Sequence, residues 1–218
     1  MNRKCVKALK GFSLIEVLVV LAIIALIASF SVPLIVRNNK SGTLTKAAEL
    51  LQLSVTQAKN EAMSGNVYVW LGIEDLTVNG RANLAVVILK SLDGSSLLTE
   101  ENIRLVSKQV DLGGVQTATL DLLPSLIQEK VLQGFGKEPF EDLAAVESNK
   151  KILVAKECFQ HFILFTPQGE ALVEGGTTIN ATTSFPPLIF IGLLDEAKKE
   201  GVGIIMNGAS AACRLYRP

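Results

Sequence analysis

The sequence is poor in the residues from which most catalytic centres are built. Histidine occurs once, at His161, and cysteine occurs three times in 218 residues. Cys158 precedes His161 by three positions, which raises the question of a nucleophile and its base. In an extended segment this spacing places the two side chains on opposite faces, and no third group that would orient the histidine is identifiable. The sequence therefore predicts no catalytic pair.

Other signatures of chemistry are missing as well. No glycine-rich stretch carries the lysine and hydroxyl residue of a phosphate loop. Asp75, Asp93, Asp111 and Asp121 lack metal-ligand spacing, and we interpret them as turn and surface acids. Lys plus Arg and Asp plus Glu each number 21, so nothing indicates the basic face that nucleic-acid binding needs. We expect no enzyme, no cofactor, no metal ion and no nucleic-acid partner.

What the sequence does contain is one long apolar run, residues 12–36, whose only charged residue is Glu16. About 20 apolar residues span a bilayer as a helix. An ionised carboxylate inside such a helix costs about 3 kcal/mol on insertion scales, so a simple anchor has no reason to keep it. The helical rise places Glu16 about 6 Å beyond Phe12, close enough to one membrane face to pair with a positive group. The residues before the run carry basic side chains and no acid, as a cytoplasmic flank does: Arg3, Lys4, Lys7 and Lys10.

The beginning of this run resembles a processing signal. Residues 10–16, Lys-Gly-Phe-Ser-Leu-Ile-Glu, are similar to the prepilin motif of type IV pilins and type II secretion pseudopilins. The resemblance implies that a prepilin peptidase cuts between Gly11 and Phe12 and N-methylates Phe12, and that Glu16 serves methylation and assembly. Pro33 falls where pilin helices carry a kink-forming proline. The alternative is a plain signal-anchor helix in which Glu16 is accidental.

The resemblance also implies a place and a role. The leader stays in the cytoplasm, the helix crosses the bacterial inner membrane once, and the C-terminal domain lies in the periplasm. The expected partners are the prepilin peptidase and methyltransferase, other pilins or pseudopilins, and an inner-membrane assembly platform. The assembled chain is then part of a periplasmic or extracellular filament, a type II secretion pseudopilus or a type IV pilus. The alternatives are a major pilin, and a membrane-anchored periplasmic binding domain or enzyme that uses the same signal.

The chain after the run continues as an amphipathic helix. Apolar residues recur at alternating spacings of four and three from Leu44 to Ala62, which predicts one buried helical face. Ser64 and Gly65 end the pattern, so we expect a long helix over about residues 12–63, bent near Pro33 or Gly42. The predicted organisation is a cleaved leader, a membrane and filament-core helix, its amphipathic continuation, and a β-rich domain: residues 1–11, 12–36, 37–64 and 65–218.

The predicted fold class is α+β, with the long N-terminal helix packed on an antiparallel sheet. Alternating or β-branched runs between turn residues predict the strands. These runs are residues 66–73, 83–92, 103–110, 115–122, 161–166, 170–174, 187–194, 203–206 and 211–216. We expect hairpins between the third and fourth, the fifth and sixth, and the last two of these runs. Residues 124–134 and 138–148 are expected to form short helices or an irregular insertion.

Within the superfamily, the domain is most similar to minor pseudopilins of the GspH/FimT type. The similar segments are residues 57–62 followed by 67–69, residues 162–169, and residues 204–216, whereas residues 122–158 depart from the pattern. Cys158 and Cys213 lie in the part expected to be periplasmic, where disulfides persist. Two alternatives therefore stand for them: a Cys158–Cys213 bridge, or two buried thiols that pack as small apolar groups.

Overall fold

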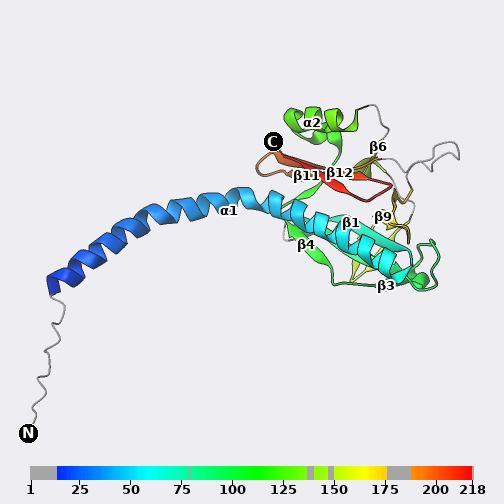
Figure 1. Cartoon of the computed structure of the whole chain (residues 1–218), viewed down its shortest axis with the longest axis horizontal. Coiled ribbons are helices and arrows are strands. Elements are labelled where there is room, and N and C mark those ends of the chain that lie inside the picture. The colour runs from blue at the N-terminus through cyan, green and yellow to red at the C-terminus, as the bar shows by residue number, and fades with distance from the viewer. Residues whose placement is uncertain (1–13, 79, 137–139, 147–149, 176–187, 218) are drawn as a thin grey trace, which may run out of the picture. The chain divides into compact units, whose positions relative to one another are not determined.

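The structure is a computed structural model that describes residues 14–78, 80–136, 140–146, 150–175 and 188–217 (Figure 1). The side chains of residues 16, 22 and 24–41 also lie outside the description. The chain divides into two compact units, residues 1–42 and 43–218, and each is described by itself. Helix α1, Leu14–Gly65, begins in the first unit and ends in the second.

The second unit contains two main sheets. The first is built from β1 (Val69–Val78), β2 (Arg81–Ser91), β3 (Ile103–Leu105), β4 (Val110–Gly113), β9 (His161–Phe165) and β10 (Ala171–Val173). Its order is β10-β9-β1-β2-β3, with β4 also paired to β2, and every pair is antiparallel. We call it sheet A.

The second sheet, sheet B, is built from β5 (Gln116–Ala118), β6 (Phe140–Asp142), β11 (Leu188–Asp195), β12 (Glu200–Asn207) and β13 (Cys213–Tyr216). Its order is β13-β12-β11-β5, and β6 pairs with β11 in parallel. The remaining elements are the hairpin of β7 (Ile152–Val154) with β8 (Glu157–Phe159), helix α2 (Ser125–Phe135), and the short helices η1 (Glu100–Asn102), η2 (Leu120–Leu122) and η3 (Leu143–Ala145).

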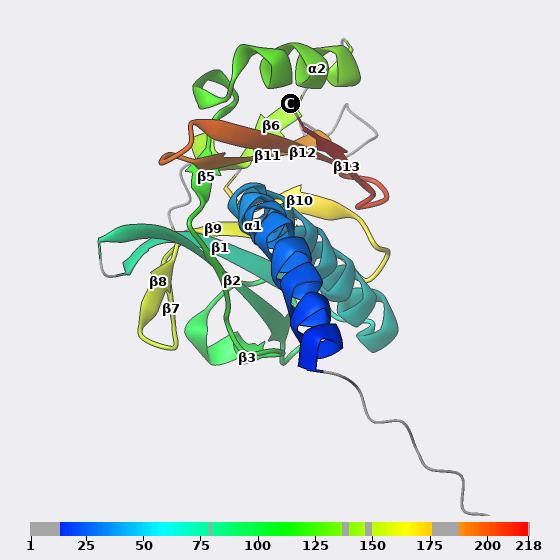
Figure 2. The ribbon, with the colours of Figure 1, turned by 90° about the vertical axis from the view of Figure 1, so that its left-hand side faces the viewer.

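The predicted apolar face of the helix is the centre of the main core. Its residues Leu44, Ala48, Leu51, Val55, Ala58 and Ala62 are all buried. They pack with the inward side chains of both sheets, such as Leu71 of β1 and Ile204 of β12. Figure 2 shows this part of α1 between the two sheets.

Each sheet is covered on its outer face too. Trp70, next to Leu71 on β1, points into a second core closed by the β7–β8 hairpin. Ile205, next to Ile204 on β12, points into a third core closed by α2. Successive strand residues face opposite sides of a sheet. Because both faces of each sheet are covered, inward-facing and outward-facing side chains are both buried, which explains the continuous apolar runs in the strand sequences.

The structure confirms the α+β class and two of the predicted hairpins, β9–β10 and β12–β13. Of the two alternatives for residues 124–134 it shows a helix, α2, whereas the described part of residues 138–148 contains strand β6 and the short helix η3. The hairpin predicted between residues 103–110 and 115–122 is wrong. Both β3 and β4 pair with β2, whereas β5 pairs with β11. Gly114, at φ +79°, lies where the chain leaves one sheet for the other. The predicted single antiparallel sheet is therefore two sheets, one of which includes a parallel pair.

Gly192 shows how tightly sheet B is built, and it generates a prediction. It pairs with Ala118 of β5, and a Cβ atom at Gly192 would overlap the carbonyl oxygen of Ala118. Because the obstacle is backbone, Gly192→Ala should lower the free energy of unfolding by about 2 kcal/mol or more. Denaturant unfolding of the full chain in a non-ionic detergent, followed by fluorescence of the sole, buried tryptophan Trp70, measures the change.

Gly113→Ala in β4 is the matched control. A Cβ atom there would lie 3.7 Å from the side-chain oxygen of Asn83, which is ordinary contact. Its effect should stay within about 0.5 kcal/mol. Equal losses in the two variants would contradict the assignment of a close β5–β11 approach.

Candidate functional site

The processing signal predicted from the sequence lies at the beginning of the chain. Gly11 and Phe12 lie outside the described residues, as do the side chains of Glu16 and Pro33. The backbone of Glu16 and Pro33 belongs to α1. A bend of the helix near Pro33 or Gly42 stays a prediction.

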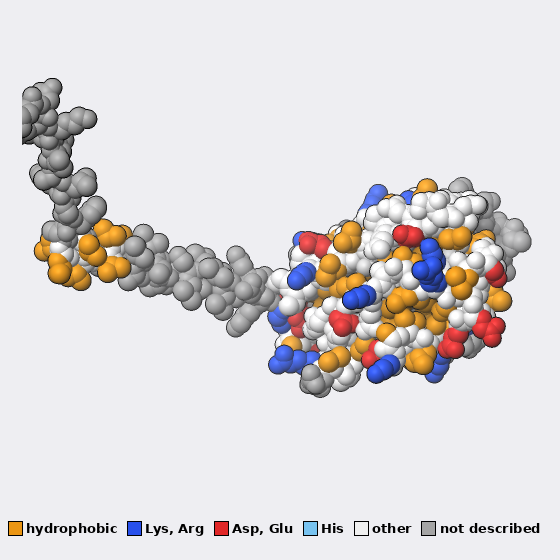
Figure 3. Space-filling model, turned by 90° about the horizontal axis from the view of Figure 1, so that it is seen from below, with side chains coloured by type: hydrophobic (Ala, Val, Ile, Leu, Met, Phe, Trp, Pro, Cys, Tyr) orange, Lys and Arg blue, Asp and Glu red, His pale blue; other side chains and the backbone are white. Residues whose placement is uncertain are grey.

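The described side chains around Glu16 form an apolar surface. Those with large exposed fractions, from 48% to 80%, are Leu14, Ile15, Val17, Leu18, Val19, Val20, Leu21 and Ile23. Successive helix residues are about 100° apart, so these side chains point in every direction around the helix. Figure 3 shows the hydrophobic side chains on one face of this segment. A helix that is apolar all round is suited to apolar surroundings on all sides. Full burial of each such side chain contributes about 1.5–3 kcal/mol.

Position 16 of this segment is the unusual one. Exposed apolar side chains, Ile15 and Val17, flank it on either side. A carboxylate transferred to apolar surroundings is strongly disfavoured unless it is paired and hydrogen-bonded. The segment therefore combines a large non-directional driving force for burial with one group that requires a positive partner.

Among the residues that the structure describes with their side chains, no helix is long and apolar enough to cross a membrane.

The two cysteines of the domain are separate. Cys158 is exposed on β8, Cys213 is half-buried on β13, and both are free thiols. Of the two alternatives, the Cys158–Cys213 bridge is therefore absent, and packing as a small apolar group fits Cys213 but not the exposed Cys158. The two cysteines do not meet because they belong to different parts of the domain. The β7–β8 hairpin packs on the outer core of sheet A, whereas Cys213 packs against the main core. Burial raises the pKa of the Cys213 thiol to about 11, which keeps it protonated and unreactive.

His161 and Cys158 lie on different strands, β9 and β8. The groups that surround His161 electrostatically are instead two acids of β1, Glu74 and Asp75. The carboxylate of Glu74 accepts a hydrogen bond from the backbone N–H of Gln160 at 2.8 Å. Burial raises the pKa of Glu74, and this bond, His161 and Lys151 oppose the rise. Glu74 thus holds the entry to β9 rather than forming a reactive pair.

Asp75 has a second structural task that the sequence did not reveal. Its carboxylate accepts hydrogen bonds from the backbone N–H and the hydroxyl of Thr117, at 2.8 Å and 2.5 Å. Thr117 belongs to β5, so this contact joins sheet A to sheet B. Burial raises the pKa of Asp75 although both bonds lower it. The interpretation of Asp75 as a plain surface acid was incomplete, because its partner lies 42 positions away.

Comparison with protein families gives a match at the beginning of the chain. Residues 7–32 match the family described as the prokaryotic N-terminal methylation motif. The matched segment contains Gly11, Phe12 and Glu16 together with the apolar surface around position 16. Neither the curated proteins nor the solved structures gave a match.

The environment of Glu74 predicts a pH dependence of stability. The pKa of Glu74 is raised above its ordinary value of 4.5, so its contribution is fully present below that value. It is lost as the pH rises through the higher folded-state pKa. Glu74→Gln keeps an acceptor for the N–H of Gln160 and removes the titration. The variant should therefore gain stability relative to the parent chain as the pH rises from about 4 to about 7.

Denaturant unfolding of both chains across that range measures the difference. The neighbouring residues Asp75, His161 and Lys151 are the same in both chains, so the comparison isolates the change at position 74. A difference that stays flat, or that falls as the pH rises, would contradict the raised pKa.

Proposed function

We propose that this chain is a pilin-like structural subunit, a minor pseudopilin, of a type II secretion pseudopilus or a type IV pilus. The observation that carries the proposal is the methylation motif over residues 7–32, which supports a type IV pilin-like or pseudopilin-like protein. The all-round apolar surface of α1 around Glu16 supports assembly through this helix. The domain is proposed to act by binding and packing, not as an enzyme.

Processing would create a cationic partner for Glu16. In the proposed step, a prepilin peptidase hydrolyses the peptide bond between Gly11 and Phe12, which releases residues 1–11 as a leader. The new α-amino group on Phe12 is then N-methylated and remains a cation at neutral pH. Glu16 lies four residues further along the chain, about 6 Å away along a helix. A carboxylate and an ammonium group thus come within reach at one end of the apolar segment.

The same helix serves two surroundings in turn. We propose that residues 12–36 first span the bacterial inner membrane once, with the domain in the periplasm. An assembly platform then extracts the helix and packs it among the helices of other subunits. Lipid contacts are exchanged for helix contacts, so apolar area stays buried and the exchange needs no exposure to water.

Glu16 decides register in this packing. In the filament core it would pair with the N-terminal amine of a neighbouring subunit or of its own chain. Low dielectric strengthens the attraction, but the desolvation of two charges offsets much of it. An unpaired carboxylate is strongly penalised, so helices that are out of register are disfavoured. The pair therefore selects an arrangement more than it adds stability.

The helix also connects the filament core to the domain. We propose one long helix whose second part packs on the sheets, because the buried face from Leu44 to Ala62 belongs to the same element as the apolar segment. A major pilin is the second candidate within this class, and abundance in sheared filaments separates the two. A membrane-anchored enzyme would need a cleft with converging reactive groups, whereas Glu74 and Asp75 are bonded to backbone groups.

Gly11→Val should block processing, because the peptidase would meet a branched side chain at the position that the motif reserves for glycine. The chain is co-expressed with a prepilin peptidase, and intact-mass spectrometry reports whether residues 1–11 are lost. Gly42→Val is the matched control, since a Cβ atom at Gly42 has no neighbour within 4 Å. Cleavage of the Gly11 variant at the parental rate would contradict the proposed site.

Glu16→Val should be cleaved normally but should fail to enter filaments, because the N-terminal amine of each neighbour loses its partner. Glu16→Gln should fail in the same way, since it keeps the shape and polarity but not the charge. Immunoblots of sheared filaments, with cleavage scored in parallel, provide the measurement. Glu61→Val, on the same helix but in the domain, is the control and should assemble. Filaments of normal amount from either Glu16 variant would refute the role.

A further inference from the structure

Strand β13 leaves one side of its backbone unpaired. It is the last strand of sheet B, with β12 on one side and no strand on the other among the described residues (Figure 2). A free edge presents N–H and C=O groups that can pair with another chain. The outer strand β10 of sheet A differs, because the N–H of Ala171 already donates to the carbonyl of Gly208 at 2.6 Å.

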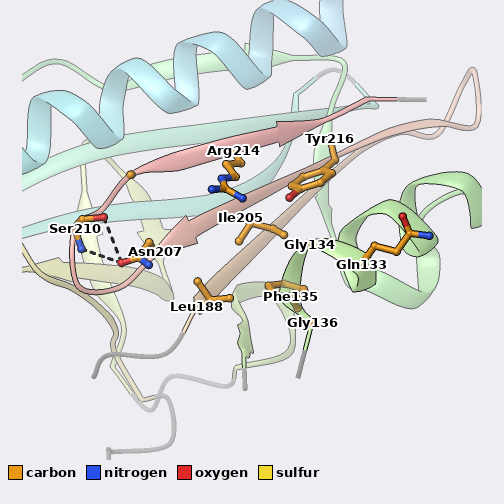
Figure 4. A pocket seen from close by; sticks show the side chains of 11 residues that line it. Gln133, Gly134, Phe135, Gly136, Leu188, Ile205, Asn207, Ser210, Arg214 and Tyr216 are labelled. Carbon is orange, nitrogen blue, oxygen red and sulfur yellow. Dashed lines mark hydrogen bonds between the residues drawn. The ribbon is translucent and has the colours of Figure 1, made fainter. Parts of the chain in front are cut away.

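Two hollows flank the free edge, one on each face of sheet B. The first, of about 450 Å³, lies beside the end of α2 and contains the side chains of Arg214 and Tyr216. Figure 4 shows both side chains on the face of β13 that points away from α1. The second hollow, of about 370 Å³, lies between α1 and β13 and includes Lys59 and Cys213. Ser210 and Ala212 line both hollows.

This arrangement matches the geometry of an added strand. Successive side chains of a strand point to opposite faces of the sheet. A peptide paired with the free edge of β13 would direct alternate side chains into the two hollows. Main-chain hydrogen bonds would supply affinity and the hollows would supply specificity, as in other cases of strand addition.

The charges in the hollows select the side chains. Among the residues that the structure describes, each hollow is lined by one cation, Arg214 or Lys59, and by no carboxylate. Arg214 forms no ion pair with any residue that the structure describes. The side-chain oxygen of Asn207 accepts bonds from the N–H and hydroxyl of Ser210, at 3.0 Å and 3.3 Å, which leaves its amide N–H groups as donors. Both hollows thus favour carboxylates.

The edge is also held in place at both ends. Lys59 donates to the carbonyl of Ser210 at 2.8 Å, before the strand begins. After the strand, Arg217 pairs with Glu49 of α1 at 3.1 Å, and Lys130 of α2 donates to the carbonyl of Arg217 at 2.9 Å. A preorganised edge loses little conformational freedom when a partner binds.

We propose that the free edge of β13 binds an extended acidic segment of a partner protein by strand addition, with one acidic side chain in each flanking hollow. This surface lies in the domain and does not depend on the processing signal. Its partner is distinct from the helices that would surround the apolar segment of α1.

The test uses the full-length, ¹⁵N-labelled chain in a non-ionic detergent and the capped peptide Ac-TVEDVT-NH₂. Its adjacent Glu and Asp face opposite sides of an extended strand. Amide shifts should appear at residues 210–217 and give a dissociation constant. Arg214→Gln and Lys59→Gln should each weaken binding about fivefold, the range of a partly exposed ion pair. Arg104→Gln is the matched control, because Arg104 lies on β3, an edge strand of sheet A rather than of sheet B. This variant should bind like the parent chain.

Three further probes separate strand addition from general attraction. The neutral peptide Ac-TVQNVT-NH₂ should bind more weakly than the acidic peptide. The acidic peptide N-methylated at all six residues keeps its charges, loses its backbone donors on both edges and should not bind. A thymidine trinucleotide, with two phosphodiester charges, should not compete. The proposal is overturned by an absence of shifts at residues 210–217, equal weakening in the Arg104 variant, binding of the N-methylated peptide, or competition by the trinucleotide.

Discussion

The domain depends on one contact, the apolar face that α1 presents to two sheets at once. Its members include four alanines, Ala47, Ala48, Ala58 and Ala62, all buried to at least 97%. Small side chains let the strands of both sheets approach the helix closely. The outer faces of the sheets are closed separately by α2 and the β7–β8 hairpin. Among the described residues, the inner faces are covered mainly by the helix and by each other. Disruption of this face would open both sheets.

Local patterns in the sequence were sufficient to predict elements whose contacts are close in the sequence. The spacing from Leu44 to Ala62 predicted the buried face of α1, and neighbouring strand-like runs separated by turn residues predicted the β9–β10 and β12–β13 hairpins. Pairing over long distances was not encoded in this way. Periodicity tells which face of a strand is buried but not which strand lies beside it. The segment around Gly114 therefore suggested a hairpin, although its two sides belong to different sheets.

Turn chemistry explains another miss. The β7–β8 hairpin turns at Ala155 and Lys156, whose φ angles are +52° and +80°. Two-residue hairpin turns with positive φ angles usually contain asparagine or glycine. Ala155 and Lys156 are neither, so the sequence carried no signal for this turn. The features of the candidate site likewise separate into local ones, which the sequence shows, and long-range ones, which it does not. The methylation motif is contiguous and visible in the sequence, whereas the bonds from Asp75 to Thr117 and from Glu74 to Gln160 span 42 and 86 positions and needed the structure.

The two parts of α1 are built for different surroundings, and this constrains how a filament of such chains would be held together. From Leu44 onward the helix is one-sided, and its apolar face is already buried against its own domain, so that face is not available to a neighbour. From Leu14 to Ile23 it is apolar on every side, which gives strong but non-directional attraction. In the proposed filament, direction would then come from polar groups: the carboxylate of Glu16 for the axial register of helices, and surfaces of the domain for the choice of neighbour. The free edge of β13 suits the second task because backbone pairing and charge in its hollows are both directional. Affinity and specificity are thereby assigned to different ends of the same chain.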